Sequence, residues 1–223
     1  MQPVAVQSPT DTEKRVAAEA AAELVEEGMA VGLGTGSTVA FLLPALAARK
    51  LRLHCVATSP ATEQEARRLG IDVAPFEGVD RLDIAIDGAD QVAPDGWLIK
   101  GGGGAHFREK IVAVAADRFV VIVDSGKSVD PLSSPVPLEL AKFGLAATLR
   151  ELGAVELRDV PESPDGGLIA DYGGPVGDPG DLATLFSATP GVVEHGLFPP
   201  QLVSDVIVGR GEKAAPLDFD GSD

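Results

Sequence analysis

The chain has 223 residues, of which 45% are hydrophobic, so it can bury one large core or a large core with a smaller one beside it. Its formal charge of −16 comes from 34 acidic and 18 basic side chains, and a field of this sign repels nucleic acids and anionic membranes. A single cysteine, Cys55, excludes an intrachain disulfide, and the sequence shows neither a signal peptide nor an apolar run of membrane-spanning length, which predicts a cytoplasmic protein.

The first half of the chain alternates predicted helices and strands. Thr10 and Glu13 form a possible capping box for a first helix that extends to Gly28. The following expected strands are 29–33, 53–58, 71–74, 82–86 and 118–123, and the expected helices are 39–48, 62–69 and 105–116. This order predicts a doubly wound, largely parallel α/β sheet of Rossmann-like type, whose ligands bind at the carboxyl ends of the strands.

The second half changes in texture, because prolines cluster from Pro131 onward. The expected strands here are 136–140, 155–158, 168–171 and 191–195, and the expected helices are 145–152 and 181–186. A last strand, 203–209, could rejoin the main sheet, and 211–223 is expected to be a loose tail. We therefore predict a catalytic α/β domain from 1–130 plus 203–223 and a small α+β domain from 131–202.

A glycine-rich loop, Gly32-Leu33-Gly34-Thr35-Gly36-Ser37-Thr38, connects a predicted strand to a predicted helix. Such a loop can leave backbone amides free to face an anion at the positive end of the helix. The spacing fits neither the Gly-x-Gly-x-x-Gly dinucleotide fingerprint nor a Walker A loop. A purely structural tight turn is the alternative that remains open.

A second glycine run is surrounded by acidic and basic side chains. The run and its charged neighbours are Asp87, Asp90, Lys100, Gly101, Gly102, Gly103, Gly104, Glu109 and Lys127. Several of these follow predicted strands, where sites form in such sheets, and paired carboxylates with a lysine can move protons on a small anionic substrate. A simple Asp-Gly turn and a flexible surface loop are the structural alternatives.

The three histidines, His54, His106 and His195, are scattered with no metal-ligand spacing, so we assign no metal. His106 stands beside the glycine run and could touch a substrate. His54 and His195 are expected to have structural roles.

The chain resembles ribose-5-phosphate isomerase of the A type over roughly residues 13–209. The motifs that carry the resemblance are the loop at 32–38, Ala57-Thr58-Ser59 with Thr62, Asp87-Gly88-Ala89-Asp90, Lys100-Gly101-Gly102-Gly103-Gly104-Ala105, Arg108-Glu109-Lys110 and the segment 190–198. His106-Phe107 departs from the family's pattern, directly beside Glu109.

This resemblance implies an isomerase of the non-oxidative pentose phosphate pathway that interconverts D-ribose 5-phosphate and D-ribulose 5-phosphate through an enediolate, without metal or organic cofactor. Glu109 would be the base, Asp87 and Asp90 would handle ring opening and the hydroxyl protons, and Lys100 would stabilise the enediolate oxygen or hold the substrate. The expected substrate contacts are Lys14, Thr35, Gly36, Ser37, Thr38 and Lys127, with Gly101, Gly102, Gly103 and Gly104 around the sugar. A homodimer or homotetramer is the family expectation.

Two other classes of function remain as alternatives. A non-catalytic sugar-phosphate sensor of the same fold would need a DNA-binding segment, and this acidic chain has only about a dozen residues before its first predicted helix. A related acyl or CoA transferase, or a dinucleotide-dependent oxidoreductase, is the third hypothesis, and the failed glycine fingerprint weakens the oxidoreductase.

Overall fold

Three β-sheets organise the computed structural model, which describes residues 8–217. The largest has six strands, in the spatial order β13 (Lys213–Pro216), β12 (Asp205–Arg210), β6 (Phe119–Asp124), β3 (Ile84–Asp87), β1 (Ala30–Leu33) and β2 (His54–Ala57). All neighbouring strands in it are parallel except the pair β12 and β13. The predicted fold class, a doubly wound and largely parallel sheet with a smaller α+β part, is confirmed.

Helices cover both faces of this sheet. The helices are α1 (Pro9–Ala22), α2 (Val39–Arg49), α3 (Pro60–Arg68) and α4 (His106–Ala115). Side chains of β6 alternate between two cores: Val120 and Ile122 pack with α1, α2 and α3, whereas Val121 and Val123 pack with α4. This burial on both faces explains why the strand reads as a continuous apolar run.

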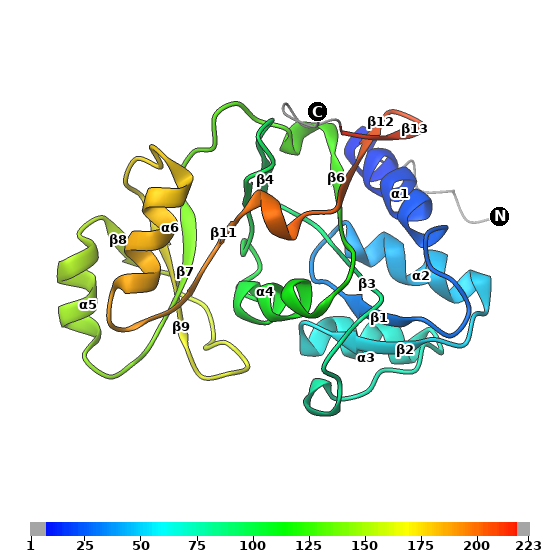
Figure 1. Cartoon of the computed structure of the whole chain (residues 1–223), viewed down its shortest axis with the longest axis horizontal. Helices are drawn as coiled ribbons and strands as arrows, with labels where there is room; N and C mark the ends of the chain where they lie inside the picture. The colour runs from blue at the N-terminus through cyan, green and yellow to red at the C-terminus, as the bar shows by residue number, and fades with distance from the viewer. Residues whose placement is uncertain (1–7, 218–223) are drawn as a thin grey trace.

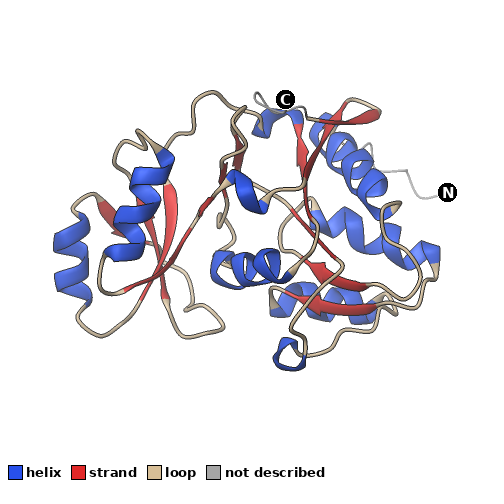
Figure 2. Cartoon of the chain, in the orientation of Figure 1, coloured by secondary structure: helices blue, strands red, loops and turns tan. Residues whose placement is uncertain are grey.

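The second half of the chain builds the other lobe of the molecule, at the left of Figure 1. Its antiparallel sheet has the order β10 (Val192–His195), β7 (Val136–Leu140), β9 (Leu168–Tyr172) and β8 (Val155–Leu157). Helices α5 (Leu145–Leu152) and α6 (Pro179–Ala188) accompany this sheet, as Figure 2 shows. The division of the chain into domains at 130/131 and 202/203 stays a prediction.

Short elements join the two lobes. Three strands, β4 (Gln91–Val92), β5 (Leu98–Ile99) and β11 (Leu197–Phe198), form a small sheet in the order β11-β5-β4. The described chain also has 3₁₀ helices at η1 (Phe76–Gly78), between α3 and β3, at η2 (Ser125–Lys127), after β6, and at η3 (Pro200–Leu202), before β12. Phe198 of β11 packs in the core beside α4, so the returning chain is anchored next to the main sheet before β12 enters it.

The strand order creates a crevice between β1 and β3. From β1 the chain passes to β2 on one side and later to β3 on the other, and the loops that leave such neighbouring strands diverge. Leu33 pairs with Ile86, so Gly34 and Asp87 lie side by side where the two strands end. The fold therefore brings the first glycine loop and the acidic motif to one edge of the sheet.

Three helices begin with the same local device, a capping side chain followed by proline. The side chains of Ser8, Ser59 and Asp178 each accept a hydrogen bond from the backbone N–H three residues later. Proline occupies the first helical position in each case, where its missing N–H costs nothing. The capping box predicted at Thr10 is therefore wrong, because Ser8 takes that role.

Glu13, the other half of the predicted box, makes tertiary contacts instead. Its carboxylate accepts hydrogen bonds from the N–H groups of Ser125 and Gly211, each at 3.0 Å. These bonds lower the pKa of Glu13, the Gly211 amide most strongly. The first helix ends at Ala22 rather than at Gly28, and Glu13 fastens it to η2, which follows β6, and to the turn that follows β12.

Two further expectations differ from the structure. The segment 71–74 is not a strand, because only Val73 forms a bridge, with the buried Cys55. The expected loose tail contains strand β13, which pairs with β12; residues 218–223 lie outside the described part of the chain.

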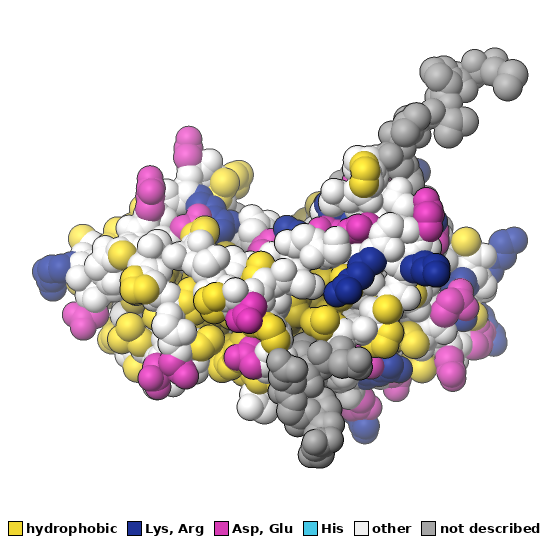
Figure 3. Space-filling view, turned by 90° about the horizontal axis from the view of Figure 1, so that it is seen from above, with side chains coloured by type: hydrophobic (Ala, Val, Ile, Leu, Met, Phe, Trp, Pro, Cys, Tyr) yellow, Lys and Arg dark blue, Asp and Glu magenta, His cyan; other side chains and the backbone are white. Residues whose placement is uncertain are grey.

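Surface charge is dispersed on the face that Figure 3 shows, where acidic and basic side chains alternate with neutral ones. Within residues 8–217, no helix combines the length and the apolar character needed to cross a membrane.

Replacing Gly209 by alanine is expected to destabilise the protein. A Cβ at Gly209 would lie 1.9 Å from the backbone oxygen of Glu13, so α1 would have to move away from β12. Overpacking of this kind costs roughly 1–3 kcal/mol. We expect Gly209→Ala to lower the free energy of unfolding, measured by urea titration, by roughly 1–3 kcal/mol or more.

Gly78→Ala is the matched control, since a Cβ there meets nothing within 4 Å and Gly78 is exposed. We expect its free energy of unfolding to stay within about 0.5 kcal/mol of the wild type. Equal stability of the two variants would contradict tight packing of α1 on β12.

Candidate active site

A polar cleft of about 90 Å³ opens at the carboxyl edge of the six-stranded sheet. One wall is the loop between β1 and α2, and the other is the glycine run that precedes α4. The lining residues are Thr35, Gly36, Ser37, Thr38, Gly88, Ala89, Asp90, Lys100, Gly101, Gly102, Gly103, Glu109 and Lys127. The structure thus brings together eleven of the fourteen site residues that the sequence predicts.

The other three predicted residues lie around the cleft. Asp87 is buried behind Lys100, and its side chain is 4% exposed. Lys14 of α1 reaches the rim, where its Nζ donates to Ser37 Oγ at 2.9 Å. Gly104 faces a second cavity on the far side of the glycine run, which Ile169 also lines.

The ammonium group of Lys100 lies at the centre of the site. Its Nζ is 3.0 Å from Asp87 Oδ2 and 3.1 Å from Glu109 Oε2, and it donates to the backbone oxygen of Gly88. These three partners match the three donors of an ammonium group. The ring of Phe198 covers the same nitrogen, with its centroid at 5.4 Å.

Burial and neighbouring charges raise the pKa values of Glu109, Asp87 and Lys100. Burial, helped by the nearby charge of Asp87, raises the pKa of Glu109 to about 8, against the opposing effect of Lys100. Burial also raises the pKa of Asp87. Burial alone would lower the pKa of Lys100, but the two carboxylates outweigh it and raise the pKa. One cation between two buried acids favours retention of a proton on the acid pair.

Only Glu109 of this acid pair lines the cleft. Both oxygens of Asp87 are already engaged: Oδ1 accepts from the N–H groups of Thr35 (2.9 Å) and Gly88 (2.7 Å), and Oδ2 faces Lys100. A Cβ at Gly34 would lie 2.0 Å from the Asp87 carboxylate, so the strand end tolerates no side chain there. Asp87 therefore fixes the glycine loop and the lysine, whereas Glu109 can reach a ligand.

Asp90 lines the cleft opposite the glycine loop. Its Oδ2 accepts a hydrogen bond from the N–H of Gly102 at 2.7 Å, while Oδ1 has no partner within residues 8–217. This arrangement leaves one carboxylate oxygen that can bind a hydroxyl group of a ligand.

The other end of the cleft is suited to an anion. Helix α2 begins after Thr38, whose side chain does not cap the helix, and its first turn contains no acidic residue. The N–H groups of Ser37 and Thr38 donate to no described residue. Lys127 of η2 lines the cleft with no partner among the described residues, and Lys14 lies at Ser37. Free amides at a helix N-terminus with two lysines are groups that can bind a phosphate or another anion.

Sequence reasoning missed several residues that support the cleft. Thr58 and Thr62 hold the first glycine loop: Thr58 Oγ1 lies 2.7 Å from Thr35 Oγ1, and Thr62 Oγ1 donates to the backbone oxygen of Gly34 at 2.9 Å. Both belong to the motif Ala57-Thr58-Ser59 with Thr62, but no role in the site could be assigned to them from the sequence. Arg158, from the other lobe, contacts the second glycine run and has no motif that could have revealed it.

The histidines differ partly from expectation. His106 does not line the cleft; it is fully buried below Gly101, where burial lowers its pKa to about 4. His195 is buried beside Ser187, as a structural histidine would be, whereas His54 is exposed. Within residues 8–217, no three His, Cys, Asp or Glu side chains are grouped to hold a metal ion.

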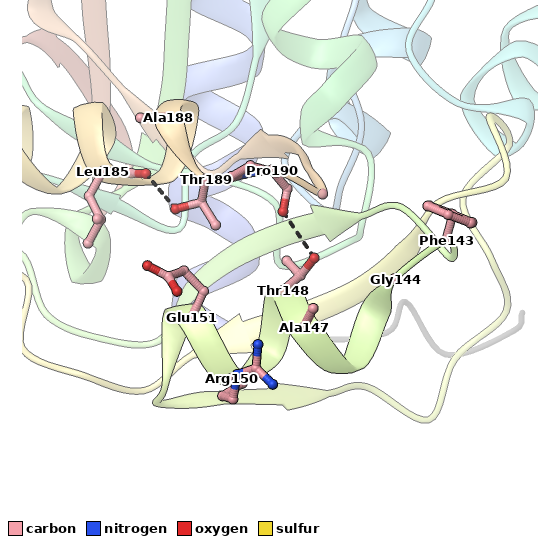
Figure 4. A pocket seen from close by; sticks show the side chains of 11 residues that line it. Phe143, Gly144, Ala147, Thr148, Arg150, Glu151, Leu185, Ala188, Thr189 and Pro190 are labelled. Atoms are coloured by element: carbon pink, nitrogen blue, oxygen red, sulfur yellow. Dashed lines mark hydrogen bonds between the residues drawn. The ribbon is translucent and has the colours of Figure 1, made fainter.

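A larger cavity, of about 690 Å³, lies between α5 and α6 in the second lobe (Figure 4). Its buried hydroxyl groups are satisfied: Thr148 Oγ1 donates to the oxygen of Pro190, and Thr189 Oγ1 donates to that of Leu185. Its charged residues, Arg150 and Glu151, are exposed. Because its hydroxyl groups are paired and its charged side chains are exposed, size alone does not make this cavity a candidate for chemistry.

Comparison with known proteins agrees with this geometry. A model of the family described as ribose 5-phosphate isomerase A (phosphoriboisomerase A) matches residues 54–213. A ribose-5-phosphate isomerase A from Caulobacter vibrioides is 44% identical over 223 residues, which cover 93% of this chain and 98% of that protein. The crystal structure of ribose 5-phosphate isomerase A from Neisseria gonorrhoeae superposes with a TM-score of 0.89 at 36% identity, covering 93% and 96% of the two chains. The enzyme from Methanocaldococcus jannaschii gives 0.86 at 33%, covering 92% and 97%.

Lys100→Met is expected to destabilise the protein strongly, because it leaves two buried carboxyl groups without their cation. Removing one partner of a buried ion pair costs about 3–5 kcal/mol. Urea unfolding near pH 8 should show a loss of this size. Lys142→Met is the matched control, since Lys142 pairs with Glu162 on the surface, and a loss below about 1 kcal/mol is expected there. A loss that small for Lys100→Met would contradict the ion-pair network.

Proposed function

This chain belongs to the ribose 5-phosphate isomerase A family and interconverts ribose 5-phosphate and ribulose 5-phosphate, a step of the pentose phosphate pathway, and we propose that Glu109 is the base of this reaction. The base removes the proton from C2 of the open-chain aldose and returns it to C1, through an enediolate. One carboxylate can perform both steps if its pKa lies near the working pH.

The observation that carries this proposal is the position of Glu109. It is the one member of the buried acid pair that lines the cleft, and its pKa is raised by burial and by Asp87. A carboxylate with ordinary acidity would be a weak base near neutral pH, whereas one held in a dry site beside another acid binds a proton more tightly.

We propose that Lys100 stabilises the enediolate oxygen. Lys100 lines the cleft, and three acceptors hold its ammonium group next to Glu109, so it acts on the developing negative charge through its fixed positive charge rather than through a free N–H donor. Burial makes this charge more effective than it would be in water. Lys100 therefore supports the charge that Glu109 creates when it takes the proton.

The geometry also supports a division of roles between the two aspartates. Asp90 has a free oxygen in the cleft and is proposed to handle ring opening and the hydroxyl protons. Asp87, with both oxygens engaged, is proposed to raise the basicity of Glu109 and to hold the loop at Thr35.

We propose that the substrate phosphate binds at the N-terminus of α2. The loop Thr35–Thr38 would offer backbone amides and hydroxyls, and Lys14 and Lys127 would add positive charge. These local groups must overcome the repulsion from a chain whose net charge is −16. The sugar then extends along Gly101, Gly102 and Gly103 toward Glu109.

A homodimer or homotetramer and a cytoplasmic location complete the proposal. Exposed apolar side chains support self-association: Phe143 is 96% exposed and Leu185 is 52% exposed beside the cavity of Figure 4, and apolar patches often mark protein contacts. The lone buried thiol of Cys55 suits a reducing compartment.

Glu109→Gln is expected to abolish turnover while substrate binding is largely kept, because glutamine has the same shape but cannot accept the proton. A general base typically contributes 10²–10⁴-fold, so we expect a loss of roughly that size or more. The measurement is conversion of ribose 5-phosphate to ribulose 5-phosphate with EDTA present. Glu151→Gln, on the exposed surface of α5, is the control and should leave turnover unchanged. Near wild-type turnover in Glu109→Gln would remove Glu109 from the mechanism.

The pH dependence of kcat/KM should report the raised pKa of Glu109. A base works only when ionised, so activity should be low when Glu109 is protonated and should rise with pH through a value near 8 rather than near 4. Asp87→Asn removes the neighbouring charge that raises this pKa, so the midpoint should move to lower pH. A midpoint that stays in place or moves upward would contradict the proposed coupling.

A further inference from the structure

We propose that Arg158 is a positioning residue for this reaction, and that it holds the glycine run at 101–103 in its active shape from the opposite lobe of the molecule. The inference rests on the proposed function, because it assigns Arg158 a role in the same site. Arg158 itself does not line the cleft.

The contact is made through one nitrogen of the guanidinium group. Arg158 Nη1 donates to the backbone oxygens of Gly101 at 3.0 Å and Gly102 at 2.9 Å. Arg158 directly follows β8, so these bonds connect the four-stranded sheet to the loop between Lys100 and α4.

Asp171 of β9 fixes the orientation of the guanidinium group. Arg158 Nε and Nη2 donate to the two oxygens of the Asp171 carboxylate, each at 2.7 Å. This two-pronged pairing restricts the planar group far more than a single bond would. The backbone adds a further restraint, because Arg158 N donates to the oxygen of Ile169. Nη1 is therefore aimed at the glycine run by a rigid pair of strands.

The glycine run needs such support because it has no side chains to hold it by packing. Glycine has the largest backbone freedom of any residue. Its two carbonyl groups bind Arg158 on one side, and on the other the N–H of Gly102 binds Asp90 at 2.7 Å. The N–H of Gly103 has no acceptor within residues 8–217, and Gly103 lines the cleft.

The run also sets the distance between two groups of the site. Together with Gly104 and Ala105, it connects Lys100 to α4, the helix that carries Glu109. Release of the two carbonyl groups would let the run rotate, which would shift Asp90 and the amide of Gly103 relative to Glu109. Misplacement of this kind lowers the rate of the chemical step more than it weakens binding of a phosphate held at α2.

The test compares Arg158→Met with Arg118→Met. Methionine keeps an apolar stem but removes every donor. Arg118 also pairs with an aspartate, Asp205, at 2.7 Å, but does not contact the glycine run. For each variant we would measure kcat and KM for ribose 5-phosphate, the melting temperature, and the isotope effect with substrate deuterated at C2.

Arg158→Met is expected to lower kcat by roughly 10- to 100-fold, with KM changed less than about threefold and a larger isotope effect. Arg118→Met should keep kcat within about twofold of the wild type. Arg158→Lys keeps the charge but loses the fork to Asp171, so its kcat should fall by less than that of Arg158→Met but by at least about threefold; it decides the matter if the methionine variant does not fold.

The proposal is overturned if kcat of Arg158→Met equals that of Arg118→Met, if Arg158→Lys turns over like the wild type, or if the whole effect lies in KM. A wild-type protein that does not convert ribose 5-phosphate would instead overturn the proposed function. The two failures are therefore distinguishable in one set of assays.

Discussion

The site depends on one buried ammonium group placed between two buried carboxyl groups. A lysine with 3% of its side chain exposed is stable only if its donors are satisfied, and Lys100 finds its partners in Asp87, Glu109 and the oxygen of Gly88. The two acidic partners come from different elements: Asp87 lies at the end of β3, directly before Gly88, and Glu109 lies in the first turn of α4. The order of the strands, with β3 next to β1, is what allows these elements to meet at one edge.

Close contacts around this site also explain the two glycine-rich segments. The Asp87 carboxylate occupies the space that a side chain at Gly34 would need. Across the cleft, the run at 101–103 exposes backbone atoms that Asp90 and Arg158 bind from opposite sides. Both walls of the cleft are therefore largely backbone, and side chains that approach from neighbouring elements determine their shape. The second lobe takes part in this, since the amide of Lys100 donates to the oxygen of Gly196 and Lys110 of α4 pairs with Glu194.

The fold class and most of the site residues could be predicted from the sequence because the patterns that indicate them are local. Alternating apolar segments determine a doubly wound sheet, and polar residues after strands must meet at its carboxyl edge. The start of a helix was harder to predict where two capping residues compete. Helix α1 begins after Ser8, with Pro9 as its first residue, and not at the capping box expected at Thr10. Arg158 could not be predicted, because a single arginine after a short strand acquires its role only through pairing between distant segments. For His106, closeness to the glycine run in the sequence left substrate contact open, but the folded chain buries its ring against Gly101, outside the lining of the cleft.

Helix α1 links the C-terminal part of the described chain to the end of the cleft at Ser37. Glu13 accepts the amide of Gly211, and the next residue, Lys14, reaches Ser37. Helix α1 packs on α2, β6, β12 and β13, and β12 and β13 are the last strands of the described residues. During synthesis on the ribosome, the first helix emerges long before the strand that holds it. The end of the cleft at Ser37 and Lys14 is therefore completed only when residues 205–211 have been added, so an incomplete nascent chain carries Asp87 and Glu109 without a finished site for the anion that we propose binds there.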